Sequence, residues 1–120
     1  MLITIACCGA AHAQTDNVVQ RIILIGDAGE LHQDGRNPVI DAVRQRYSMQ
    51  DARNTVIYLG DNVYPYGLPD EADKRYPHAK EILDYEVGLV QHTAANAIFV
   101  PGNHDWNKMK PNGWSIVRNQ

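Results

Sequence analysis

The fold class is decided by Arg21-Ile22-Ile23-Leu24-Ile25 and by Gly26-Asp27-Ala28-Gly29, which follows directly. A short, unbroken apolar run of this kind is typical of a central parallel strand that is buried on both faces. Two later stretches repeat the arrangement: Thr55–Leu59 precedes Gly60-Asp61-Asn62, and Ala97–Val100 precedes Pro101-Gly102-Asn103-His104-Asp105. The sequence therefore predicts three strands, each of which ends at a glycine and an oxygen-bearing side chain.

Two helices are predicted between these strands. The first begins at Asn37-Pro38, with asparagine as the N-cap and proline at the first helical position. The second runs from Ala79 to roughly Thr93, after a polar loop or broken helix over residues 68–76. Apolar residues recur on one face of each: Val39, Ile40, Val43 and Tyr47, then Leu83, Val87, Val90 and Ala94. The order β-α-β-α-β indicates an α/β fold with a parallel sheet and right-handed crossovers.

Composition excludes several classes of protein. The 120 residues are 44% hydrophobic and 21% charged, which is ordinary for one globular domain. Eleven basic and fourteen acidic residues give a net charge of −3, so we do not expect nucleic acid or an anionic membrane as a partner. No apolar run reaches the roughly 18 residues of a membrane span.

The first residues resemble a targeting segment. An uncharged apolar stretch, Leu2–Ala11, leads into Ala11-His12-Ala13, which fits a signal-peptidase site. No Lys or Arg precedes Arg21, so the usual positive charge is missing, and a buried N-terminal strand is the alternative. We expect a signal peptide over residues 1–13, a domain over residues 14–120, and export to the periplasm or outside the cell. Both cysteines, Cys7 and Cys8, would leave with the signal, so no disulfide or thiolate site is expected.

The three strand ends predict one site. In open parallel sheets, ligands bind beyond the carboxyl ends of the strands, so we expect the side-chain oxygens of Asp27, Asp61 and Asn103 to converge. Two carboxylates this close cannot both stay ionised without a cation. Carboxylate and amide oxygens suit hard metal ions, and phenolate or imidazole extends the set to iron, zinc and manganese.

The three blocks together resemble those of the calcineurin-like metallophosphoesterases, over Arg21 to Trp106. Tyr64, three residues after Asp61, and Ala28-Gly29 after Asp27 resemble the purple acid phosphatase branch in particular. The resemblance implies the parallel-sheet half of a four-layer sandwich. It also implies two metal ions, iron with iron, zinc or manganese, and hydrolysis of phosphate monoesters.

Roles follow from the resemblance residue by residue. Asp27 and Tyr64 would bind the first metal, Asp61 would bridge the two metals, and Asn103 would bind the second. His104 would contact the phosphate and protonate the leaving group, and Asp105 would orient His104. A protonated histidine beside the leaving oxygen acts as a general acid.

One departure from the family bears on activity. The family takes further metal ligands from two later histidine blocks, one of them Gly-His-x-His, and no Gly-His-x-His occurs in the printed sequence. We therefore expect the N-terminal half of a phosphoesterase, whose missing C-terminal half is a required partner. The 120 residues alone would be inactive, and the alternative function is a non-catalytic fragment with at most weak metal binding. A nucleotide-binding module is a third and weaker alternative, because Gly26-x-x-Gly29 lacks the Lys-Ser/Thr of a P-loop. We also expect one apolar face of the sheet to be exposed, because two helices cannot cover both faces.

Overall fold

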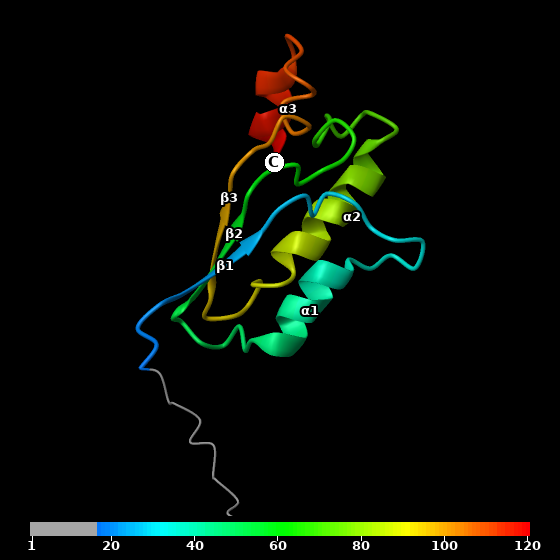
Figure 1. Ribbon diagram of the computed structural model, residues 1–120. Coiled ribbons are helices and arrows are strands. Elements are labelled where there is room, and N and C mark those ends of the chain that lie inside the picture. The colour runs from blue at the N-terminus through cyan, green and yellow to red at the C-terminus, as the bar shows by residue number, and fades with distance from the viewer. Residues whose placement is uncertain (1–16) are drawn as a thin grey trace, which may run out of the picture.

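A computed structural model describes residues 17–120. Strands and helices alternate along the chain: β1 (Arg21–Ile25), α1 (Pro38–Arg46), β2 (Asn54–Tyr58), α2 (Tyr76–Val87), β3 (Asn96–Phe99) and α3 (Gly113–Asn119) (Figure 1). The expected signal peptide and both cysteines lie outside the described residues. No helix within residues 17–120 has the length and apolar character needed to cross a bilayer.

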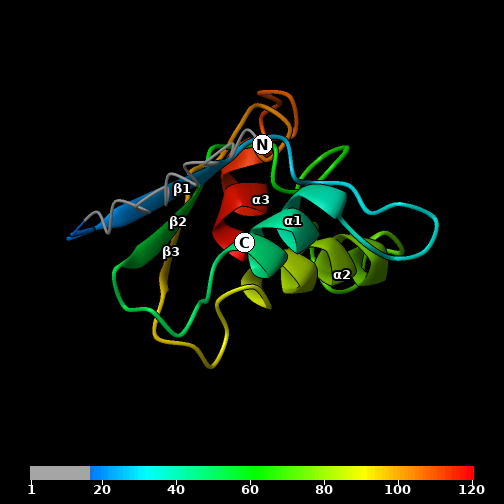
Figure 2. The same cartoon turned by 60° about the horizontal axis from the view of Figure 1, so that its bottom comes forward.

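The three strands form one parallel sheet in the order β1-β2-β3. The α/β class and the parallel pairing are therefore confirmed. Right-handed crossovers that always advance in the same direction place their helices on the same face of a sheet. Figures 1 and 2 show this arrangement, with α1 and α2 side by side on one face of the sheet.

The core lies between this face and the two helices. Ile23 and Ile25 of β1, together with Val56 and Tyr58 of β2, are buried against Ile40 of α1. The Tyr58 ring also stacks on Phe99 of β3, with 4.5 Å between ring centroids, and its hydroxyl donates to the Glu86 carbonyl at 2.8 Å. The last residues of β2 and β3 are thereby anchored together and to the end of α2.

The opposite face of the sheet is open to solvent. Ile22, Leu24 and Ile98 project there with 60%, 60% and 50% of their surface exposed. The expectation that β1 is buried on both faces is wrong for this chain, because α1 and α2 both pack on the other side. The expectation of an exposed apolar face is confirmed.

The helices differ from the predicted ones in three respects: the exposure of Val39, the bounds of α2 and the presence of α3. Asn37 caps α1 as expected, and its side-chain oxygen accepts from the Val39 and Ile40 amides at 3.1 Å each. Val39 itself is 53% exposed, so it is not part of the buried face. Helix α2 begins three residues earlier than predicted, because Pro77 fits the first turn of a helix. It ends at Val87, with Gly88 as its C-cap, so the predicted end near Thr93 is wrong. The short α3 was not predicted; its Ile116 is buried while Trp114 is 62% exposed.

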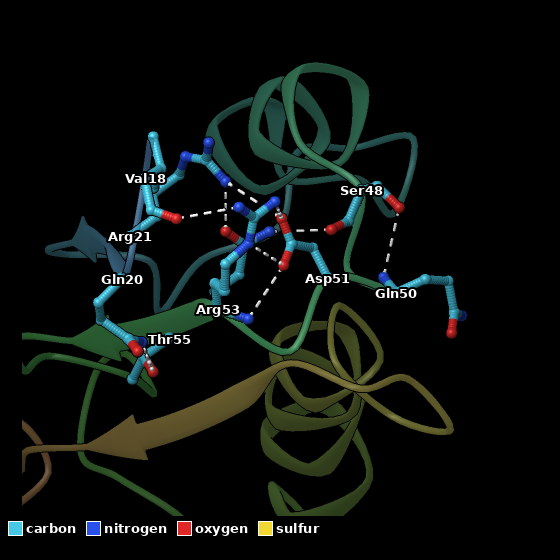
Figure 3. Close-up of polar contacts among 9 residues, drawn as sticks. Val18, Gln20, Arg21, Ser48, Gln50, Asp51, Arg53 and Thr55 are labelled. Atoms are coloured by element: carbon cyan, nitrogen blue, oxygen red, sulfur yellow. Dashed lines mark hydrogen bonds and ion pairs between the residues drawn. The ribbon is translucent and has the colours of Figure 1, made fainter. Parts of the chain in front are cut away.

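Charged side chains join the amino ends of β1 and β2, at the edge opposite the strand ends discussed below (Figure 3). Arg53 binds both carboxylate oxygens of Asp51 at 2.9 and 2.8 Å and donates to the Val18 carbonyl at 2.9 Å. Arg21 donates to Asn54 Oδ1 at 2.6 Å across the two strands. The Arg53 guanidinium lowers the pKa of Asp51 to about 2, so this network stays charged over the physiological range.

Glu86 on α2 is a carboxyl group in the core. It is fully buried, and neither carboxyl oxygen has a hydrogen-bond partner among residues 17–120. Burial, and next the negative charge of Asp105, raise the pKa of Glu86 to about 9. The folded protein therefore holds Glu86 as a neutral acid at pH 7, whereas the unfolded chain ionises it near its ordinary pKa of 4.5.

Replacing Glu86 should reveal this difference as a pH dependence of stability. The contribution of Glu86 is most favourable below pH 4.5 and is lost as pH rises toward 9, because only the unfolded state gains the charge. Glu86→Gln should therefore stabilise the protein at pH 7, on the order of 3 kcal/mol, and much less at pH 5. Urea unfolding at both pH values measures the difference, with the exposed Glu81→Gln on the same helix as the control. An equal effect at the two pH values would show that Glu86 is already charged in the folded state.

Candidate metal centre

Two aspartates occupy equivalent positions at the carboxyl ends of neighbouring strands. Asp27 follows Gly26 after β1, and Asp61 follows Gly60 after β2; both have φ of 53°, in the left-handed region. Aspartate is one of the few non-glycine residues that adopt this conformation at modest cost. The two turns share this left-handed aspartate, and both carboxylates lie within hydrogen-bond distance of the Tyr64 hydroxyl at the same edge of the sheet.

Tyr64 joins the two carboxylates. Its hydroxyl lies 2.9 Å from Asp27 Oδ1 and 3.1 Å from Asp61 Oδ2. Burial, and then the hydrogen bonds to the two carboxylates, raise the pKa of the Tyr64 phenol above its ordinary value. The hydroxyl has one proton for two acceptors, so at least one carboxylate faces a phenol oxygen without a hydrogen between them.

Glycines allow the strand-end loops to approach each other closely. A Cβ on Gly102 would overlap the amide nitrogen and Oδ1 of Asp61, and a Cβ on Gly29 would overlap the backbone of residues 61–63. Gly26, in contrast, has open space where a Cβ would lie. The close contacts between these loops therefore require Gly29 and Gly102, whereas Gly26 takes no part in them.

His104 lies against both Asp61 and Tyr64. Its backbone amide donates to Asp61 Oδ1 at 3.0 Å, and its ring meets the Tyr64 ring edge-on with 4.6 Å between centroids. Ring atom Nδ1 lies 2.8 Å from the Pro65 carbonyl. Because a carbonyl only accepts, Nδ1 carries the hydrogen in this bond and Nε2 is the nitrogen available to other groups.

Asp105 has a different place from the one expected. Its carboxylate is fully buried and accepts from the backbone amides of Asn62 and Val63, each at 3.0 Å, and from the Gly102 amide at 2.7 Å. The orienting contact to His104 is therefore made by the Pro65 carbonyl and not by Asp105. Asp105 instead ties the loop after β2 to the loop after β3. The sequence did not predict that the Pro65 carbonyl binds His104 or that the amides of Asn62 and Val63 bind Asp105. These partners are backbone groups, which every residue type carries, so a residue pattern does not indicate them.

Asn103 lies in the loop after β3, beside His104. Its carbonyl accepts from the Lys108 amide at 2.7 Å, and the residue is exposed. Its side chain makes no hydrogen bond with Asp27, Asp61 or Tyr64 in the described part of the chain. The structure thus brings Asp27, Asp61 and Tyr64 into direct contact and places Asn103 at the same edge of the sheet.

The donor set fits a hard cation in part. Two carboxylates and a phenol meet at one point, and carboxylate and phenolate oxygens suit iron and manganese. Over residues 17–120, however, no three His, Cys, Asp or Glu side chains are grouped as metal ligands. Asp27, Asp61 and Tyr64 therefore offer oxygen donors that a metal ion could use, but among the described residues they do not make up a full set of ligands.

Comparison with known proteins gives one match. A family model described as calcineurin-like phosphoesterase matches residues 20–119. No curated protein and no solved structure matches the chain. The match spans all three strands, the three glycine-containing strand ends and the whole of α3.

Adding a methyl group at Gly102 tests the packing of the two loops. Gly102→Ala should lower the free energy of unfolding by about 2 kcal/mol, because the new Cβ must displace Asp61. Gly26→Ala is the matched control and should change stability by less than about 0.5 kcal/mol, since nothing lies within 4 Å of its Cβ position. Urea unfolding compares the two variants. Equal losses would mean that the loops do not meet at Gly102.

Proposed function

Because the chain belongs to the calcineurin-like phosphoesterase family, we propose that it forms the half of a metal-dependent phosphoesterase domain that supplies oxygen ligands to a dinuclear metal centre. The reaction proposed is hydrolysis of phosphate monoesters, as in the acid phosphatases of the purple branch. The observation that carries this proposal is the contact of the Tyr64 hydroxyl with both Asp27 and Asp61. A phenol placed between two strand-end carboxylates is suited to a ferric ion, for which phenolate is a strong ligand.

The metal ligands in this proposal divide between two ions. Asp27 and Tyr64 would hold the first ion, Asp61 would be a ligand of both, and Asn103 would hold the second through its side-chain oxygen. The ions, when bound, supply Lewis-acid charge that offsets the negative charge developing on the phosphoryl group. Iron paired with iron, zinc or manganese fits the donors present.

His104 acts on the leaving group in the proposed mechanism. The Pro65 carbonyl accepts the Nδ1 hydrogen and thereby orients the ring. Because Nδ1 is occupied by this bond, Nε2 is the nitrogen that gives its proton to the leaving group. Transfer of the Nε2 proton to the leaving oxygen is general acid catalysis, with a typical contribution of about 10² to 10⁴ in rate. Asp105 contributes indirectly, because it holds the His104 loop against the Asp61 loop.

Remaining ligands must come from outside residues 17–120. Oxygen donors alone leave much of the coordination sphere to water, and the family takes imidazole ligands from later histidine blocks. The non-catalytic alternative, weak metal binding without turnover, applies to the 120 residues by themselves. Export, proposed from Ala11-His12-Ala13, would place the enzyme in the periplasm or outside the cell.

Two substitutions separate metal binding from proton transfer in the complete enzyme. Asp61→Asn should abolish hydrolysis of p-nitrophenyl phosphate and release metal, because a neutral amide cannot bridge two cations. His104→Ala should lower kcat by about 10² or more while metal content stays constant. Elemental analysis and kcat are measured together, with Asp34→Asn in the exposed β1–α1 loop as the control. Equal metal loss in Asp61→Asn and His104→Ala would refute the division of roles.

The 120-residue chain alone should be nearly inactive. Its described residues hold no cluster of three His, Cys, Asp or Glu ligands, so a metal ion would exchange rapidly with solvent. The purified chain is assayed with p-nitrophenyl phosphate plus iron, zinc or manganese, and bound metal is counted. Two tightly bound ions per chain and turnover near the roughly 10 per second of an ordinary enzyme would show that no further ligands are needed.

A further inference from the structure

Three cationic side chains surround the ring of Tyr66. The Arg75 guanidinium carbon lies 5.9 Å from the ring centroid, and the ammonium groups of Lys108 and Lys110 each lie 5.4 Å from it. A single cation over an aromatic face is common, because the ring face carries partial negative charge. Three cations around one ring bring like charges together, and the ring alone offsets little of their repulsion.

Among residues 17–120, a carboxylate pairs with only one of these three cations. Arg75 binds Asp73 through two hydrogen bonds of 2.9 and 2.6 Å. Neither Lys108 nor Lys110 has a carboxylate within ion-pair distance among residues 17–120. Among the described residues, both ammonium groups therefore lack a carboxylate partner and lie 5.4 Å from the same ring centroid, so both would attract an anion bound beside the ring.

The loop after β3 holds the two lysines in place. The Lys108 amide donates to the Asn103 carbonyl at 2.7 Å, and the Lys110 amide donates to the Asn107 carbonyl at 3.3 Å. Asn107, Lys108 and Met109 all have positive φ, between 50° and 60°, which makes a tight left-handed turn. Such a turn costs backbone free energy in non-glycine residues, and it directs both lysines toward Tyr66.

This group of residues adjoins the candidate metal centre. Tyr64 and Tyr66 are separated only by Pro65, whose carbonyl binds His104. A pocket of about 130 Å³ is lined by both tyrosines and by Arg75. On the other side, Lys108 is bonded through its backbone to Asn103. Tyr66 and Arg75 therefore share a pocket with Tyr64, the residue whose hydroxyl contacts both strand-end carboxylates.

We propose that Tyr66, Arg75, Lys108 and Lys110, the Tyr66 cation cluster, bind a second phosphate group of the substrate. The proposal rests on the proposed function and names its substrate class: phosphate esters that carry another phosphate. Lysine binds phosphate as a compact point charge, and two lysines match the double negative charge of a phosphate monoester better than that of a carboxylate. The tyrosine ring contacts both ammonium groups, each 5.4 Å from its centroid, in the absence of a substrate.

Substrate selectivity is the kinetic test in the complete, metal-loaded enzyme. The quantity measured is the ratio of kcat/KM for benzene-1,4-diyl bisphosphate to that for phenyl phosphate. Lys108→Ala and Lys110→Ala should each lower this ratio about tenfold, the value of one charge-assisted contact. Arg46→Ala, an exposed cation at the C-terminal end of α1, is the charge-matched control and should leave the ratio unchanged. A wild-type ratio at or below one, or an equal change in all three variants, would overturn the proposal.

Metal-free binding separates this inference from the proposed function. Calorimetry with inorganic pyrophosphate in the presence of a chelator should show a Kd that weakens about tenfold in each lysine variant and not in Arg46→Ala. Tyr66→Phe, which keeps the ring, should bind like the wild type, whereas Tyr66→Leu should bind less well. Lysine-dependent binding without any ester hydrolysis would refute the proposed function and keep the anion site. Hydrolysis with lysine-independent pyrophosphate binding would refute the anion site alone.

Discussion

The buried carboxylate of Asp105 is the interaction on which the candidate site depends. It lies outside the predicted metal donors, yet it accepts from backbone amides on both sides of the gap between the loops after β2 and β3. A buried charge is expensive unless hydrogen bonds compensate it, and several backbone amides provide that compensation. By joining these loops, Asp105 places Asp61 within hydrogen-bond distance of the His104 amide. The proposed proton donor, His104, and the proposed metal ligand, Asp61, are thereby held in one geometry.

The one-sided sheet accounts for both the packed core and the open apolar face. Successive crossovers in one direction put α1 and α2 on the same face, which gives a compact core around Val56 and Tyr58. The same topology leaves Leu24 and Ile98 exposed on the other face. An apolar surface of this kind is typical of a face that packs against another element. It agrees with the proposal that more of the domain is needed, as does the partial metal coordination.

Charge is distributed unevenly around the strand ends. Asp27 and Asp61 concentrate negative charge around the Tyr64 hydroxyl, whereas Lys108 and Lys110 concentrate positive charge around Tyr66, two residues further along the chain. The loop after β2 thus presents one tyrosine to each region. A metal cation would offset the first region and a phosphate anion the second, so the two regions are electrostatically suited to different parts of one ligand.

The sequence by itself determined the strands, the Asn37 cap and the edge at which Asp27, Asp61 and Tyr64 meet, because apolar runs, capping residues and strand-end turns are local signals. Tertiary structure decided the rest. Asp105 turns inward because the amides of Asn62 and Val63 become available only when the loops pack, and the partner of His104 is a backbone carbonyl that no residue pattern marks. The short α3 is stabilised by the burial of Ile116 against Gly67. A helix of seven residues is too short to be stable without such packing. The open face of the sheet depends in the same way on where both helices pack, since the apolar residues of β1 alternate between a covered and an exposed face although the sequence shows no alternation.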